Sequence, residues 1–152
     1  MKPEETIDFH IRWAWARISR MYNQEASKHG GTMSVGYVLL NIDREGTPST
    51  KLGPKMGMEP RSLTRTLKSM EEAGLIIRRP DSFDGRMVRV FLTDKGSVLR
   101  EESKRVVISF NEFIRNHIAP EKLETFFEVM TEMNALCESE EIFVNPPKSQ
   151  AV

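Results

Sequence analysis

Apolar residues near the middle of the chain recur at the spacing of an amphipathic helix. Leu63, Leu67 and Met70 stand four and seven residues apart, which places them on one helical face. Pro60 suits the first position of such a helix, and Gly74 suits its end. The pattern therefore predicts a short helix with one buried face.

A second short helix is expected directly before it. Thr47 is a candidate N-cap with Pro48 in the first turn, Leu52 and Met56 are spaced to point inward, and Gly57 provides a turn. Two short helices on either side of a tight turn have the spacing of a helix-turn-helix motif.

The hydrophobic period shortens after this motif. Residues 75–79 are expected to form a strand, residues 80–85 a turn, and residues 87–92 a return strand. The three segments predict a β-hairpin.

Longer helices are expected around this block. One spans residues 6–29, a shorter one is capped by Ser34 and stopped by Gly46, and a long one is capped by Thr93 and ends near residue 118, where Pro120 opens the last helix. The outer helices carry more apolar residues than a small domain can cover, so we expect a second copy of the chain to cover them.

The predicted fold is mainly α with a small β-hairpin wing. We expect a winged helix-turn-helix domain at residues 34–96, an N-terminal dimerisation helix within residues 1–33, and dimerisation helices within residues 97–141. Residues 142–152 are Pro-rich and polar, and we expect them to form a flexible tail.

The charge is distributed unevenly. The 152-residue chain has a formal net charge of zero, but residues 51–100 hold 11 Lys and Arg against 6 Asp and Glu, whereas residues 111–141 hold 2 against 8. A local basic face is enough for DNA, because phosphate contacts act over short, screened distances. The chain shows no membrane span or signal-peptide core, and its single cysteine, Cys137, suits a reducing cytoplasm.

The second helix of the motif offers side chains suited to the major groove, and the hairpin tip offers an arginine suited to the minor groove. The candidate DNA-binding residues are Arg61, Ser62, Thr64, Arg65, Lys68, Asp84 and Arg86. A solvated helix face and an ordinary turn are the alternative interpretations. Arg78 or Arg79 could instead serve structure by pairing with an acid such as Glu71 or Asp81.

The hairpin sequence resembles the wing signature of the MarR family. Asp84 and Arg86 precede a strand that ends in Leu92 and Thr93, and Gly96 follows three residues later. Residues 63–65 and 70–78 are similar to that family's recognition helix and its exit into the wing. The resemblance implies a homodimer that reads a palindromic operator in double-stranded DNA, most often as a repressor. Many members of the family release DNA when a small aromatic or acyl effector binds, and some respond to oxidation instead.

Two departures stand out at the start of the recognition helix. Pro60-Arg61 replaces the small polar pair common there, and Glu59 places an acid where phosphate is expected. The target site is therefore expected to differ from typical ones, with Glu59 facing away or the helix start shifted.

A low-ranked effector pocket is assigned to Trp13, Arg17 and Tyr37, although aromatic residues at helical spacing more often belong to a core or a dimer interface. The histidines and Cys137 show no metal-ligand spacing, and the acids around Cys137 disfavour a reactive thiolate. No cofactor is expected, and no catalytic motif is found, so the chain is not expected to be an enzyme. The alternative function is a winged-helix module for protein contacts without a DNA target.

Overall fold

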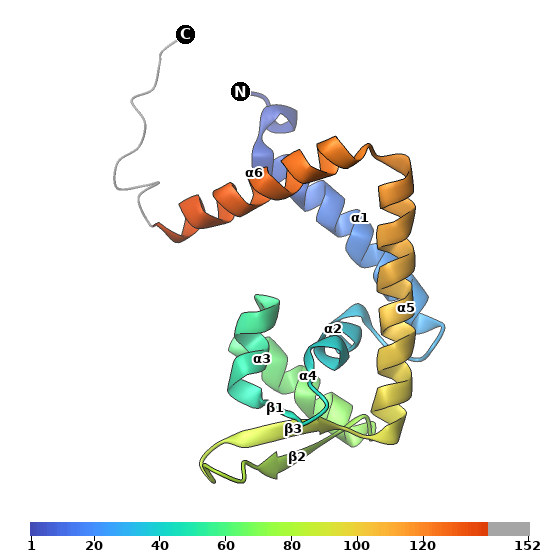
Figure 1. Cartoon of the computed structure of the whole chain (residues 1–152), viewed down its shortest axis with the longest axis vertical. Helices are drawn as coiled ribbons and strands as arrows, with labels where there is room; N and C mark the ends of the chain where they lie inside the picture. The colour runs from blue at the N-terminus through green and yellow to red at the C-terminus, as the bar shows by residue number, and fades with distance from the viewer. Residues whose placement is uncertain (140–152) are drawn as a thin grey trace. The chain divides into compact units, whose positions relative to one another are not determined.

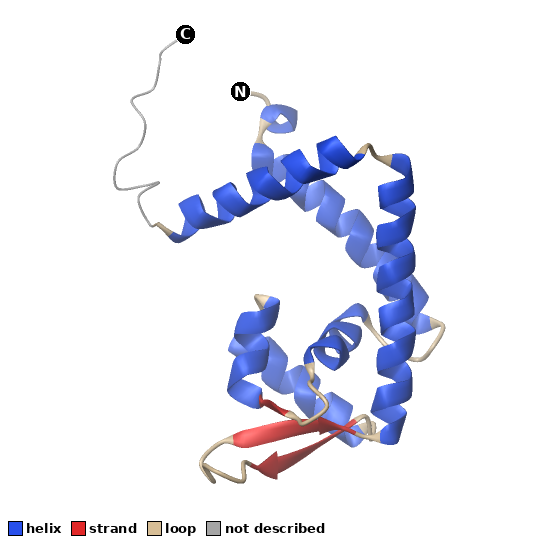
Figure 2. Cartoon of the chain, in the orientation of Figure 1, coloured by secondary structure: helices blue, strands red, loops and turns tan. Residues whose placement is uncertain are grey.

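The computed structural model describes residues 1–139, and the predicted tail at residues 142–152 lies outside the described residues. Figure 1 labels the helices and strands along the chain, and Figure 2 colours them by type. In chain order the elements are η1 (Pro3–Glu5), α1 (Ile7–Ser27), α2 (Met33–Asn41), β1 (Thr47–Pro48), α3 (Ser49–Met56), α4 (Pro60–Glu72), β2 (Ile76–Pro80), β3 (Val88–Leu92), α5 (Asp94–His117) and α6 (Pro120–Glu138).

The chain divides into two compact units. The first covers residues 1–108 and the second begins at Ser109, so the boundary falls within α5. The predicted class, mainly α with a small β wing, is confirmed.

The first unit is built on one hydrophobic core. The core joins α2, α3, α4 and the sheet, and its buried members are Val38, Leu39, Ile42, Leu52, Leu63, Leu67, Met70, Leu75, Ile76 and Val90. The inward face predicted for α4 is therefore confirmed at all three of its positions.

The helix-turn-helix geometry depends on Gly57. This residue has a φ of +58° and ends α3, where the amide of Met58 donates to the carbonyl of Gly53 at 3.1 Å. The left-handed conformation favours glycine, because a Cβ is strained there. The predicted turn is confirmed, and α4 begins at Pro60 as expected.

The prediction for Thr47 is wrong. Thr47 does not cap α3; it pairs with Val90 in a three-stranded antiparallel sheet with the order β1-β3-β2 (Figure 1). Its hydroxyl donates to the carboxylate of Asp43 at 3.0 Å and accepts from the Asp43 amide at 2.9 Å. The threonine thus closes the loop between α2 and β1 instead of beginning a helix.

The prediction that Ser34 caps α2 is also wrong. The structure begins α2 at Met33 with Thr32 as N-cap, and the Thr32 hydroxyl accepts a hydrogen bond from the amide of Val35 at 3.3 Å. Both residues are good caps by type, so the choice depends on where the preceding loop leaves α1.

The junction between the wing and α5 is tightly packed. Thr93 caps α5 as predicted, accepting from the Gly96 amide at 3.0 Å, and its own amide donates to the Leu75 carbonyl at 3.1 Å. A Cβ built on Gly96 would lie 1.9 Å from that same carbonyl oxygen. Gly96 is therefore needed because α5 and the start of β2 approach too closely for a side chain.

The second unit holds the end of α5 and α6. Its described part buries no residue fully, and it exposes the large apolar side chains of Phe113, Ile118, Phe126, Phe127, Val129 and Leu136. Arg115 lies over the Phe127 ring at 5.8 Å. Within residues 1–139, no helix has an apolar stretch sufficient to cross a membrane.

Candidate nucleic-acid interface

The outer face of α4 carries the five predicted major-groove residues, and all five are exposed. Arg61 and Arg65 form no ion pair with any described residue, whereas Lys68 lies 4.0 Å from Glu72 one turn later. Leu63 and Leu67 anchor the opposite face in the core. The helix therefore presents two arginines outward from a fixed backbone.

A hydrogen bond within α4 limits the contacts that Thr64 can make with another molecule. The Thr64 hydroxyl donates its hydrogen to the carbonyl of Pro60 at 2.9 Å. That leaves the oxygen as an acceptor and the methyl group available for an apolar contact such as a thymine methyl. Ser62 is exposed beside it, and its carbonyl accepts from the Thr66 hydroxyl at 3.0 Å.

The structure begins α4 at Pro60, as the sequence predicts. Glu59 is the N-cap, and its side chain makes no capping hydrogen bond. The helix start is therefore not shifted, and the exposed carboxylate of Glu59 flanks the positive end of the helix dipole.

The wing tip holds Asp84 and Arg86 in one turn. The Asp84 carboxylate accepts from the Arg86 amide at 3.0 Å, and the Asp84 carbonyl accepts from the Met87 amide at 2.9 Å. Asp84 thus braces the backbone of the turn, while the exposed Arg86 side chain makes no ion pair with a described residue.

A second aspartate in the wing, Asp81, was missed as an organising residue. It is buried, and its carboxylate accepts from the amides of Phe83 at 2.9 Å and Asp84 at 3.1 Å and from the Arg89 guanidinium at 2.8 Å. The hydrogen bond from the Phe83 amide, followed by those from Arg89 and from the Asp84 amide, holds the pKa of the Asp81 carboxyl below its usual range. Arg89 also donates to the Gly46 carbonyl at 2.8 Å, which ties the wing to the loop before β1.

The strand pattern alone could not identify this pair. Arg89 alternates with buried Val90 on β3, a pattern that predicts a solvent-facing arginine. The usable signal was an aspartate at the start of a turn, since such side chains commonly accept from amides two residues on.

Arg78 connects α4 to the wing. Its Nε donates to the Glu71 carboxylate at 2.9 Å, and this contact lowers the pKa of the Glu71 carboxyl. The predicted structural role of Arg78 is confirmed for one of the two acids proposed, whereas Asp81 pairs with Arg89. The pair helps to orient α4 relative to the hairpin.

The predicted effector residues separate in the structure. Tyr37 lines a cavity of about 50 Å³ between the end of α1, α2 and residues 99–107 of α5. Trp13 and Arg17 do not line it; the Arg17 guanidinium lies 5.8 Å from the Trp13 ring on the exposed surface of α1.

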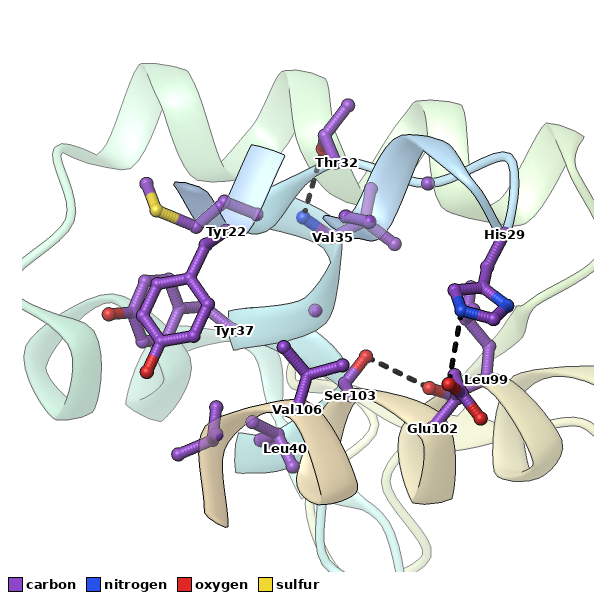
Figure 3. Close-up of a pocket in the computed structure, with 15 residues that line it drawn as sticks. Tyr22, His29, Thr32, Val35, Tyr37, Leu40, Leu99, Glu102, Ser103 and Val106 are labelled. Atoms are coloured by element: carbon purple, nitrogen blue, oxygen red, sulfur yellow. Dashed lines mark hydrogen bonds and ion pairs between the residues drawn. The ribbon is translucent and has the colours of Figure 1, made fainter. Parts of the chain in front are cut away.

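Figure 3 shows the cavity with two phenol rings, Tyr22 and Tyr37, at one side and the His29–Glu102 pair at the other. Burial raises the pKa of both tyrosine hydroxyls. His29 Nε2 lies 3.0 Å from Glu102, whose carboxyl pKa is lowered chiefly by Arg105. The sequence did not indicate this lining, because its members come from three separate segments.

Comparison with known proteins gives a consistent result. Residues 36–88 match the model of the MarR family. The fold is similar to that of MepR in a structure of the S. aureus MepR–DNA complex, with a TM-score of 0.79 and 18% identity over 86% of this chain and 97% of that one.

Two further solved structures share the fold. The transcriptional regulator SlyA gives a TM-score of 0.77 and 18% identity over 92% of this chain and 100% of that one. PcaV, a transcriptional regulator from Streptomyces coelicolor solved with its natural ligand, gives 0.76 and 18% over 89% and 96%.

Proposed function

We propose that this protein is a MarR-family winged helix-turn-helix transcription regulator, because residues 36–88 match the model of that family. In this proposal it binds double-stranded DNA as a homodimer at a palindromic operator. The family consists of DNA-binding regulators, not enzymes. The carrying observation is the outer face of α4, where Arg61 and Arg65 stand exposed on a helix whose other face is fixed in the core.

Each element of the interface has a distinct role in this proposal. Arg65 and Arg61 read base edges in the major groove, where an arginine pairs bidentately with guanine. Ser62, Thr64 and Lys68 contact phosphates or the thymine methyl. Arg86 enters the minor groove from the wing, with Asp84 holding the turn behind it.

The test is selection from a pool of random duplexes with the full chain, followed by sequencing. We expect an inverted repeat with half-sites about one helical turn apart. Affinity for the selected duplex should fall steeply with salt, because several phosphates release their counterions. Failure to enrich any sequence at low salt would favour a protein-contact module instead.

The cavity beside Tyr37 is the proposed effector site. It is too small for a drug-sized ligand, since such sites enclose about 300 Å³ or more, so binding has to widen it by moving α5 or the end of α1 away from α2. Since α2 packs on α3 and α4 through the shared core, that movement reaches the DNA-reading helix. This makes the protein a ligand-responsive repressor that releases DNA when a small aromatic or acyl compound binds.

A cavity-filling variant tests this regulation. Val106→Phe, on the α5 side of the cavity, should leave operator affinity within a few-fold of wild type and abolish release by aromatic carboxylates and acyl compounds. Screening such compounds for operator release from the wild-type protein supplies the positive control. Release that persists in Val106→Phe would place the effector elsewhere.

A further inference from the structure

The wing tip carries an aromatic side chain that the fold itself does not use. Phe83 lies between β2 and β3 and is 98% exposed. A phenylalanine buries about 150 Å² or more where it serves a core. Here the ring is left in solvent, in the turn that joins the two strands.

Hydrogen bonds hold the turn that presents the ring. The Phe83 amide donates to the Asp81 carboxylate at 2.9 Å, and the buried Asp81 is held in turn by Arg89. Because this backbone is already ordered, binding through the ring loses less conformational entropy than binding through a mobile loop.

The ring shares its turn with the proposed minor-groove arginine. Arg86 follows three residues later, and its amide is fixed by Asp84, whose own amide is fixed by Asp81. A basic side chain that follows a narrow, negative groove, joined to an apolar side chain that enters a base step, is a combination by which proteins bind and bend the minor groove.

We propose that Phe83 is an apolar wedge that packs into a base step of the minor groove next to Arg86. The wedge partly unstacks that step, so the protein favours operator flanks with flexible TA or CA steps. This inference rests on the proposed DNA-binding function, and it adds a specificity determinant that touches no base edge.

The two wing residues prefer different flanks, which gives a sharp test. Arg86 alone favours stiff A-tracts with their narrow groove, whereas a wedge favours TA steps, which are equally A·T-rich but easily unstacked. The selected operator is therefore prepared with AAAA or TATA flanks, and the full chain is compared with Phe83→Ala, Phe83→Leu and Ser82→Ala.

We expect Phe83→Ala to lose about ten-fold in affinity on TATA flanks, in the range of one lost base-stacking contact, and little on AAAA flanks. Phe83→Leu should retain most of the affinity, because leucine is also a wedge residue, and Ser82→Ala, which removes an exposed neighbour, should match wild type. The fluorescence of 2-aminopurine in the TA step should rise with wild type and not with Phe83→Ala. All variants should melt at the wild-type temperature, because both positions are exposed.

Equal affinities and flank preferences for wild type and Phe83→Ala, with unchanged 2-aminopurine fluorescence, would overturn the wedge while leaving DNA binding intact. That pattern is also what a ring reserved for a protein partner would give. If the wild-type chain binds no duplex at all, both the proposed DNA-binding function and the proposed wedge are wrong.

Discussion

At the scale of single residues, the Arg65→Ala variant tests whether the protein recognises a DNA sequence or only the charge of the phosphate backbone. Arg65→Ala should weaken binding to the selected operator about ten-fold or more, in line with the 1–3 kcal/mol of one bidentate base contact, and weaken binding to random duplex much less. Competition titrations with both duplexes give the ratio. Lys104→Ala removes the same charge from an exposed position on α5 and is the matched control. An equal loss on both duplexes would reduce Arg65 to a phosphate contact.

Asp81 predicts a defined pH response of the wing. Its folded-state pKa lies below the value of about 3.9 in the unfolded chain, so its contribution is present above that pH and is lost as the pH falls through the folded-state pKa. Wild type should therefore melt at a higher temperature than Asp81→Asn at pH 7, and the two melting curves should converge in acid.

Asp84→Asn is the control for this experiment. Asp84 is exposed and accepts only from amides, which an asparagine oxygen can replace. A gap between wild type and Asp81→Asn that stays constant from pH 7 to pH 3 would show that the Asp81 charge does not brace the wing.

At the scale of elements, Gly96 determines how the wing meets α5. Gly96→Ala forces its Cβ against the Leu75 carbonyl oxygen, so we expect destabilisation by about 3 kcal/mol, at the upper end of overpacking costs. Urea denaturation measures the loss. Gly85→Ala is the matched control, since a Cβ there meets nothing within 4 Å. Equal stability of the two variants would mean that α5 shifts away without cost.

Elements with their own periodic signal were predictable from the sequence. The inward face of α4 and the Gly57 turn depend on residues a few positions apart, and both were predicted correctly. Thr47 shows where such reasoning stops. Its local context suits a helix cap, but the pairing partner that makes it a strand, Val90, lies 43 positions away. Local propensity is overridden there by a contact that only the tertiary fold creates.

The candidate site also contains features that the sequence predicts and features that it does not. Exposure of Arg61, Arg65 and Arg86 followed from helix and turn patterns, because those patterns fix which side faces solvent. The Asp81–Arg89 pair and the cavity beside Tyr37 did not, since each assembles residues from distant segments. DNA contact by these residues stays a prediction, which the Arg65 comparison tests directly.

At the scale of the whole molecule, exposed apolar surface predicts a dimer. Trp13 on α1 and Phe126 on α6 are 54% and 53% exposed in the single chain, and Leu136 is 63% exposed. Apolar surface of this extent is expected to be covered by another copy of the chain. Light scattering at micromolar concentration should therefore give twice the monomer mass of 17.5 kDa.

Phe126→Glu tests whether dimerisation is required for tight binding to the palindrome. A carboxylate buried at the dimer contact without a partner is costly, so we expect the dimer dissociation constant to rise at least about ten-fold. Two linked half-sites bind more tightly than one, so affinity for the full palindrome should fall far more than affinity for an isolated half-site. Glu124→Ala, which changes an exposed charge on the same helix, should alter neither. Two results would contradict this prediction: a wild-type chain that scatters as a monomer, or a Phe126→Glu variant that still prefers the full palindrome by the wild-type margin. Either result would show that α6 does not form the dimer contact, and the two-fold symmetry of the site would need another source.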